Sequence, residues 1–333
     1  MMVFCLLLML NSFYLLGIMS ISVFIDGQAG TTGLQVAEKL AKHPHVTLVT
    51  LADGLRKDAD ARKDAFATAD AAILCLPDEA AIEAANLAKD CDVVLIDAST
   101  AHRTSDDWVY GMAELGQDQR DAIASSKLIS NPGCYPTGFL AIIHPLRKAG
   151  LLPADAQLSV PAISGYTGGG KGLIQSFEDD RGPRHFSYAH GLSHKHLGEM
   201  KKLAGLDQTP LFMPSVGDFA QGMLVHVPLF ESQLTQKVSA DDIASLFQET
   251  YQDSGLITAY DANDTAYFTA TGFLAADGLK GTDRLEVFTS YNAQNGQFWL
   301  SARLDNLGKG ASGAAVQNLN IALGFDEITG LDL

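Results

Sequence analysis

A glycine-rich turn directly after the first β-branched run constrains the fold of this chain more than any other feature. Residues 21–26 read ISVFID, and the next seven residues read GQAGTTG. This G-x-x-G-x-x-G spacing allows a tight turn and a close approach of the backbone to a pyrophosphate, which the amides of a helix N-terminus can bind. Because the turn follows a strand and precedes a helix at 34–41, it favours a dinucleotide site over a plain tight turn. The residues expected at this site are Gly27, Gly30, Thr31, Thr32 and Gly33.

The first third of the chain alternates between short apolar runs and helical stretches. Apolar runs lie at 46–51, 71–76 and 93–97, and an alanine-rich helix is expected at 79–89. Continuous apolar runs between helices are typical of a parallel sheet that is covered on both faces. The first lobe is therefore predicted to be a doubly wound, Rossmann-type α/β domain.

The second half of the chain has a different pattern of apolar and polar residues. Longer, alternating segments at 223–228, 284–291 and 297–305, with a helix at 240–251, predict an α+β lobe with a mainly antiparallel sheet. An amphipathic helix at 313–323 could return to the first lobe. The expected division is a nucleotide-binding domain at 20–133, a catalytic domain at 134–305 and a C-terminal returning segment at 306–333.

The N-terminal segment carries no charged side chain before Asp26 and looks at first like a signal sequence or membrane anchor. It lacks a positive n-region and an A-x-A cleavage site, and the first core strand follows it at once. We expect translation to start at Met19 and residues 1–18 to be an upstream in-frame extension. A true anchor is the alternative, since apolar stretches of ~18 residues can insert into a bilayer.

The net charge indicates a small-molecule partner, and the cysteine content indicates a reducing compartment. Twenty-three Lys and Arg against 39 Asp and Glu give a charge of −16, which repels nucleic acids and acidic membranes. The four cysteines contain no C-x-x-C pair and are too scattered for a disulfide framework, so the chain is predicted to be cytoplasmic.

The cofactor preference follows from the end of the second strand. Asp53 stands about where an acid would hold the ribose 2′-hydroxyl of NAD, but Arg56 and Lys57 follow it at once. Two cations there can neutralise a 2′-phosphate, which favours NADP(H); the alternative is a solvated turn.

A second glycine-rich segment, GYTGGGK at 165–171, fits the G-x-x-x-x-G-K pattern of a P-loop. Gly172 replaces the Ser or Thr that would hold magnesium, so a nucleotide triphosphatase is not expected. The segment is predicted to be a flexible loop over a site, with Lys171 reaching an anion, or else a plain exposed loop.

Cys134 is the candidate nucleophile. A short strand at 128–130 is followed by NPGCYPT, in which Gly133 permits a sharp turn and Pro136 is tolerated in a first helical turn. This places Cys134 at the N-terminus of a helix running to about Arg147, where the helix dipole and a nearby cation lower the pKa of a thiol. The other central thiols, Cys75 and Cys91, are assigned to packing.

The histidines of the segment HGLSHKHLGEM, residues 190–200, supply candidate acid–base groups. His196 and Glu199 are three residues apart and share a helix face, so Glu199 could orient His196 for proton transfer. A metal site and simple packing are the alternatives, and the absence of further ligand spacing argues against the metal.

Five motifs in order resemble the N-acetyl-gamma-glutamyl-phosphate reductase family. They are DASTAHR (97–103), VYGMAEL (109–115), SNPGCYPT (130–137), HGLSHKHLGEM (190–200) and DNLGKGASGAAVQN (305–318). The opening FIDGQAGTTGLQV is most similar to the shorter subtype, and the resemblance runs from about residue 20 to the C-terminus.

The resemblance implies NADPH-dependent reduction of N-acetyl-L-glutamyl 5-phosphate to the 5-semialdehyde, with phosphate release, in arginine biosynthesis. It implies a fold like that of aspartate-semialdehyde and glyceraldehyde-phosphate dehydrogenases, and a homodimer or tetramer. The roles it suggests are Cys134 as thioester-forming nucleophile, His194 in preference to His196 as acid–base residue, Arg103 and Ser99 near the substrate phosphate, and Asn131, Asn306 and Gly310 in support of the catalytic and nicotinamide sites.

Two rival functions remain open at the level of sequence. One is an aspartate-semialdehyde dehydrogenase-like enzyme of the same architecture, against which the H-x-H-x-x-E segment argues. The other is a non-catalytic NADP(H)-sensing regulator, which would keep the glycine-rich turn and dispense with Cys134 as a nucleophile.

Overall fold

The structure is a computed structural model that describes residues 20–179 and 183–333. The expected extension at 1–18, with a start at Met19, lies outside the described residues. Within the described ranges, no helix has the length and apolar character needed to cross a bilayer.

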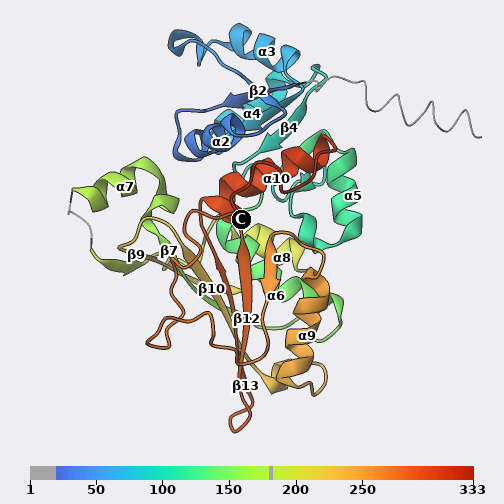
Figure 1. Cartoon of the computed structure of the whole chain (residues 1–333), viewed down its shortest axis with the longest axis vertical. Helices are drawn as coiled ribbons and strands as arrows, with labels where there is room; N and C mark the ends of the chain where they lie inside the picture. The colour runs from blue at the N-terminus through green and yellow to red at the C-terminus, as the bar shows by residue number, and fades with distance from the viewer. Residues whose placement is uncertain (1–19, 180–182) are drawn as a thin grey trace, which may run out of the picture.

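The first lobe is built around a six-stranded, fully parallel sheet (Figure 1). The strand order is β2-β1-β3-β4-β6-β5, with β1 Ile21–Asp26, β2 Val46–Val49, β3 Ala71–Leu74, β4 Val94–Asp97, β5 Val109–Tyr110 and β6 Leu128–Ser130. The helices of this lobe are α2 Thr31–Ala41, α3 Ala59–Thr68, α4 Asp78–Leu87 and α5 Gln117–Ser125.

Both faces of this sheet are buried, which explains the continuous apolar runs. Val23 and Ile25 of β1 join one hydrophobic cluster, whereas Phe24 between them joins the cluster on the opposite face. Since successive side chains of a strand point to opposite faces, a strand covered on both sides is apolar throughout. The prediction of a doubly wound lobe is confirmed.

The chain crosses from β1 out to β2 and then back past β1 to β3, so the strand order reverses beside β1. Ligands of open α/β sheets bind at such a reversal, beyond the carboxyl ends of the strands. The first helix starts here at Thr31, three residues earlier than the sequence predicted, which places both threonines in its first turn.

The second lobe holds a seven-stranded mixed sheet in the order β11-β12-β13-β10-β7-β9-β8. Its strands are β7 Ser159–Gly165, β8 His185–Ser187, β9 Leu211–Gly217, β10 Met223–Phe230, β11 Ile257–Ala259, β12 Leu285–Asn292 and β13 Gln297–Leu304. Four neighbouring pairs are antiparallel, as predicted, and the pairs β7–β9 and β11–β12 are parallel.

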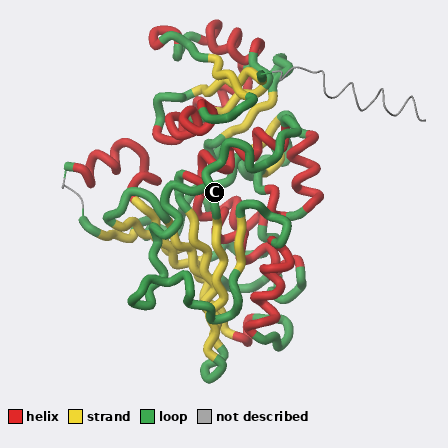
Figure 2. Tube along the Cα trace, viewed as in Figure 1, coloured by secondary structure: helices red, strands yellow, loops and turns green. Residues whose placement is uncertain are grey.

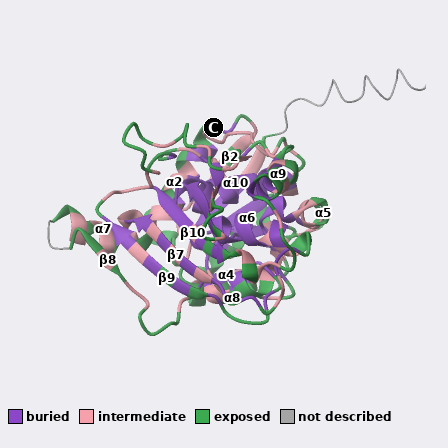
Figure 3. Ribbon diagram, turned by 90° about the horizontal axis from the view of Figure 1, so that it is seen from below, coloured by how far each residue is buried: buried purple, intermediate pink, exposed green. Residues whose placement is uncertain are grey.

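Helices cover one face of this sheet, as the tube in Figure 2 shows. The helices of this lobe are α6 Cys134–Lys148, α7 Gly170–Glu178, α8 Leu197–Leu203 and α9 Ala240–Tyr251. Helix α6 packs on β10 and β13 and is buried along most of its length (Figure 3).

Helix α10 (Gly313–Ala322) returns to the first lobe and packs on α2 and α5 (Figure 1). It follows a short π-helical turn at Gly308–Ser312, an element that often marks a functional site. Nine of its ten residues are buried, so this helix joins the two lobes rather than lying on the surface.

Candidate active site

A cavity of about 510 Å³ lies where the two lobes meet. Its wall is built from the start of α2, the turn before α6, the end of β7, the loop before α8 and the segment that leads into α10. Of the residues singled out from the sequence, the lining includes Thr31, Thr32, Arg103, Asn131, Cys134, His194, His196, Asn306 and Gly310.

The start of α2 is shaped to receive an anion. Its N-cap, Gly30, provides no side-chain hydrogen bond, and the first turn holds no acidic residue, so backbone amides stay available at the positive end of the helix. Gly27 has a φ of +89°, and a Cβ there would overlap the carbonyl oxygen of Cys75. A Cβ on Gly33 would come within 2.5 Å of the Gly27 carbonyl oxygen. These features fit a dinucleotide pyrophosphate.

The cationic pair predicted to read a 2′-phosphate lies beyond the cavity. Arg56 follows a 3₁₀ turn at Asp53–Leu55 and forms an exposed ion pair with Asp53 at 2.7 Å. Lys57 is exposed beside it. The acid that would otherwise hold a ribose hydroxyl is therefore paired with an arginine.

Cys134 is the first residue of α6, as the sequence predicted, and it is partly buried in the cavity wall. The neighbouring π-helical turn comes close to it: a Cβ on Gly310 would lie 2.8 Å from the Cβ of Cys134. Only a residue without a side chain fits there.

The prediction that the pKa of the Cys134 thiol is lowered is wrong for the ligand-free protein. Burial raises the pKa of Cys134 to about 11, although the charges of Arg103 and Lys195 and a backbone hydrogen bond from Tyr135 act in the opposite direction. The helix N-terminus and the cations are present as expected, but desolvation of the thiolate outweighs them. The resting thiol is protonated at neutral pH.

Arg103 and Glu199 form a buried ion pair behind the nucleophile. The guanidinium donates to Glu199 at 3.0 Å, to the carbonyl of Asn131 at 2.8 Å and to the carbonyl of Ala98 at 3.1 Å. Burial lowers the pKa of Arg103, but the charges of Glu199 and Tyr110 raise it by more, so the guanidinium stays charged.

Glu199 does not orient His196, contrary to expectation. Its carboxylate accepts hydrogen bonds from Arg103, from the Tyr110 hydroxyl at 2.8 Å and from the Gly133 amide at 3.1 Å. It therefore fixes the turn that presents Cys134. Tyr110 lies in the VYGMAEL motif, and sequence reasoning missed it because nothing in the spacing links it to Glu199, 89 residues away.

The two imidazoles of the H-x-H motif are both present and both neutral. Their ring centroids lie 4.7 Å apart. Burial, and then the charge of Lys195, lowers the pKa of His194 to about 4. Burial, and then Arg103, lowers the pKa of His196 far below its usual range.

The tautomer of His194 follows from one hydrogen bond. Its Nδ1 accepts from the backbone amide of His196 at 3.2 Å, so the ring proton resides on Nε2. By contrast, the Nδ1 of His196 is buried and has no hydrogen-bond partner within the described chain. His194 can thus donate a hydrogen bond from Nε2.

Two predicted phosphate contacts point elsewhere. The Ser99 hydroxyl donates to Asp97 at 2.7 Å, which also contacts His102 at 2.6 Å. Lys171 is exposed on α7 and is not part of the cavity lining. The GYTGGGK segment lies over the cavity as predicted, and residues 167–170 line it. It is a 3₁₀ turn at Tyr166–Gly169 and the start of α7 instead of a loop, because β7 and the carbonyl of Ala220 hold its first residues.

Asn131 and Asn306 position backbone rather than projecting freely. Asn131 donates to the carbonyl of Ala311 and accepts from Asn318, both at 3.0 Å. Asn306 donates to the Thr167 hydroxyl at 3.0 Å and accepts from the Gly222 amide at 2.9 Å. In the part of the chain that the structure describes, no three His, Cys, Asp or Glu side chains gather as a metal site would require.

Comparison with known proteins agrees with this architecture. The semialdehyde dehydrogenase NAD-binding domain matches residues 22–124, and the semialdehyde dehydrogenase dimerisation domain matches residues 134–306. Aspartate semialdehyde dehydrogenase from Francisella tularensis has the same fold at 14% identity, with a TM-score of 0.70 over 90% of this chain and 99% of that one. The enzyme from Vibrio cholerae, complexed with ASA, gives 15% identity and a TM-score of 0.68 over 92% and 98%.

Fold and site together define an oxidoreductase of the semialdehyde dehydrogenase type. Its sequence is 46% identical to the N-acetyl-gamma-glutamyl-phosphate reductase of Trichormus variabilis, over 93% of this chain and 98% of that protein. It is also 46% identical to the Brucella canis reductase of the same name, over 91% and 98%. The chain belongs to the N-acetyl-gamma-glutamyl-phosphate reductase family.

Proposed function

We propose that this protein catalyses the NADPH-dependent reduction of N-acetyl-L-glutamyl 5-phosphate to N-acetyl-L-glutamate 5-semialdehyde, with release of phosphate, as a step of arginine biosynthesis. The observation that carries the proposal is that one cavity joins the thiol of Cys134, two neutral imidazoles and the uncapped start of α2. A nucleophile and a dinucleotide cradle that share a wall are what reduction of an acyl group through a thioester requires.

The first half-reaction uses Cys134. Its sulfur bonds to the acyl carbon, the carbon–oxygen bond to phosphate breaks, and phosphate leaves with that electron pair. Since the resting thiol is protonated, its proton passes to the departing phosphate as the carbon–sulfur bond forms. The Glu199–Gly133 hydrogen bond keeps the nucleophile turn fixed during this exchange.

The second half-reaction reduces the thioester. NADPH, when bound, supplies the hydride. His194 donates from Nε2 to the oxygen that gains negative charge, and this oxyanion then expels the sulfur of Cys134 to leave the aldehyde. The thiolate takes up a proton, which its high pKa favours.

The preference for NADP(H) over NAD(H) rests on the Arg56–Lys57 pair at the rim of the first lobe. Their charges can meet a 2′-phosphate, and the Asp53–Arg56 ion pair removes the free acid that a ribose hydroxyl would need. Replacement of both cations by serine should weaken NADPH binding by at least about tenfold and leave NADH binding unchanged. Equal weakening of both would contradict the assignment.

A homodimer is proposed on the uncovered face of the second sheet. Alternate residues of its strands point away from α6 and are apolar: Leu211, Met213, Phe230 and Trp299, the last two more than half exposed. An open apolar face in a domain of the dimerisation type fits a second copy of the chain. Trp299→Glu should shift the protein toward monomer in analytical ultracentrifugation, whereas the exposed-site control Leu55→Glu should not.

A cytoplasmic location belongs to the same proposal, because a thioester-forming thiol has to stay reduced. Among the described residues Cys75, Cys91 and Cys134 are all free.

The decisive assay is phosphate-dependent reduction of NADP⁺ with N-acetylglutamate semialdehyde, run beside aspartate semialdehyde. Preference for the acetylated five-carbon aldehyde is expected. Preference for aspartate semialdehyde would favour the rival dehydrogenase function instead.

Substitution of the nucleophile separates the enzyme from a cofactor-sensing regulator. Cys134→Ser should abolish turnover while NADPH binding persists, because a serine hydroxyl without its own base is a far weaker nucleophile. Appreciable residual turnover would argue against the thioester route. Calorimetric titration with NADPH provides the binding control.

A further inference from the structure

The structure leaves Lys195 in the active cavity without an assigned role. Among the described residues, the cavity lining contains two permanently cationic side chains, Arg103 and Lys195. Lys195 lies between the two histidines in the loop before α8. The mechanism above uses the neighbouring His194 but not Lys195 itself.

Arg103 is already held by the protein, although its Nη1 and Nη2 each carry a second N–H. All three nitrogens of its guanidinium donate to groups of the protein: Nε to the Asn131 carbonyl, Nη1 to Glu199 and Nη2 to the Ala98 carbonyl. The charge of Arg103 is balanced by a carboxylate that is only 1% exposed. Moving this guanidinium onto a phosphate would leave Glu199 buried without a counter-ion, which costs several kcal/mol.

The ammonium of Lys195 is in the opposite situation. Within the described part of the chain, no hydrogen bond or ion pair holds it, and the residue is exposed to the cavity. Its positive charge acts on three groups of the active site: it lowers the pKa of Cys134, of His194 and of His196. It also acts on Asp78 at the start of α4, whose carboxylate already accepts from Thr100.

We propose that Lys195 binds the phosphate group of the substrate and of the released product, and that Arg103 positions the nucleophile turn through Glu199. This inference rests on the proposed function. A protein with a net charge of −16 needs a local cation to admit a phosphorylated, carboxylated substrate, and a mobile ammonium can follow the phosphate as it leaves the acyl carbon.

The test compares Lys195→Met with Lys195→Arg, which keeps the charge, and with Lys201→Met, which removes a charge from an exposed position on α8 nearby. Initial rates are measured in the direction of aldehyde oxidation, so that phosphate and aldehyde are separate substrates. Lys195→Met should raise the KM for phosphate at least about tenfold, or about 1.4 kcal/mol, and leave the KM for aldehyde within about twofold. Lys195→Arg should recover most of the loss, and Lys201→Met should match the unmodified protein. An unchanged KM for phosphate, or an equal rise for both substrates, would overturn the inference.

A second measurement does not depend on turnover. Inorganic phosphate should slow the alkylation of Cys134 by iodoacetamide in the unmodified protein and in Lys201→Met, but not in Lys195→Met. Equal protection in Lys195→Met would show that another group holds the phosphate. If the protein failed to reduce NADP⁺ with either aldehyde and still showed Lys195-dependent protection, the proposed function would fail while the phosphate site stood.

Discussion

At the scale of single residues, ion pairing balances the charges of Arg103 and Glu199, and burial keeps Cys134 and His194 uncharged. Glu199 holds Arg103, Tyr110 and the Gly133 amide, so it acts on the nucleophile through the backbone rather than through an imidazole. Burial keeps Cys134 protonated and His194 neutral at physiological pH. The nucleophile of the ligand-free protein is therefore uncharged.

The pH dependence of Cys134 alkylation tests this state. Since the thiolate is the reactive form and the pKa is raised to about 11, the thiolate fraction grows about tenfold for each pH unit between pH 7 and pH 9. Iodoacetamide labelling, followed by mass spectrometry of the peptide that contains Cys134, should therefore accelerate across this range without a plateau. A plateau below pH 8 would mean that the thiol is ionised at rest. Cys134→Ser controls for labelling of other cysteines.

At the scale of elements, two helix starts and one π-helical turn meet at the cavity. Helix α2 offers free amides, α6 begins at the nucleophile, and the Gly308–Ser312 turn closes the remaining side. Helix α2 and the π-helical turn each come close to neighbouring backbone at a glycine. Gly33 approaches the carbonyl of Gly27, and Gly310 approaches Cys134.

Substitution of Gly310 tests how tightly the π-helical turn fits. The added methyl of Gly310→Ala would lie 2.8 Å from the Cβ of Cys134 and 3.0 Å from the Asp305 carbonyl oxygen, so one of the two must move. A displacement near 1 Å at a reacting group costs about a hundredfold in rate, and we expect a fall in kcat/KM of that size. Gly172→Ala, which meets nothing within 4 Å on α7, should leave kcat/KM within about twofold. Similar activities of the two variants would show that the turn adapts.

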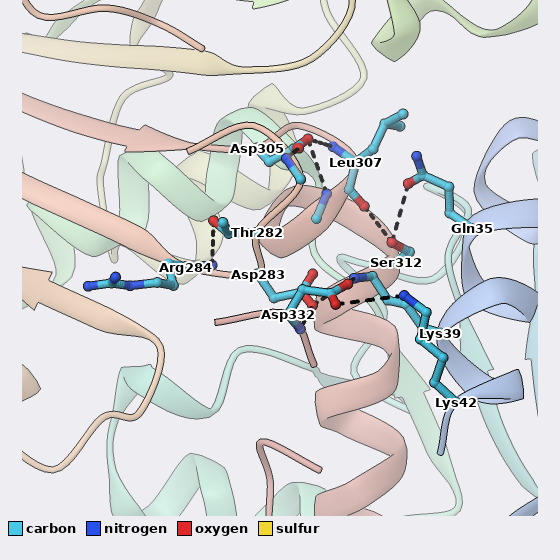
Figure 4. A network of polar contacts seen from close by, with 12 residues as sticks. Gln35, Lys39, Lys42, Thr282, Asp283, Arg284, Asp305, Leu307, Ser312 and Asp332 are labelled. Atoms are coloured by element: carbon cyan, nitrogen blue, oxygen red, sulfur yellow. Dashed lines mark hydrogen bonds and ion pairs between the residues drawn. The ribbon is translucent and has the colours of Figure 1, made fainter. Parts of the chain in front are cut away.

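At the scale of the whole molecule, the C-terminal segment holds the lobes together. Lys39 of α2 donates to Asp283 at 2.7 Å and to Asp332 at 2.8 Å, and the Asp332 amide donates to Asp283 at 2.8 Å (Figure 4). Ser312, at the end of the π-helical turn, reaches Gln35 of α2 in the same view. A second buried pair joins Lys309 to Glu114 at 2.6 Å. These contacts tie the first lobe to the second lobe and to the C-terminal segment.

Removal of Lys39 tests this clamp. Lys39→Met would leave the fully buried Asp283 without its cation, and loss of one partner of a buried pair destabilises by about 3 kcal/mol. Urea denaturation should show a lower midpoint with an unchanged slope. Lys42→Met is the matched control, because Lys42 is mostly exposed and 3.8 Å from Asp332, and its midpoint should not move measurably. Equal midpoints for the two variants would contradict a structural role for Lys39.

The sequence by itself determined the local features: the parallel lobe, the helix that begins at Cys134 and the cradle at Gly27 to Gly33. These features follow from side-chain periodicity and from backbone constraints within a few residues, and both can be recognised in the sequence. Only the tertiary structure decided which side chains form ion pairs and which groups are ionised. Arg103 and Glu199 are 96 residues apart and Lys39 and Asp283 are 244 apart, so their pairing depends on packing. The ionisation of Cys134 depends on how much solvent the assembled wall excludes, which no local pattern encodes.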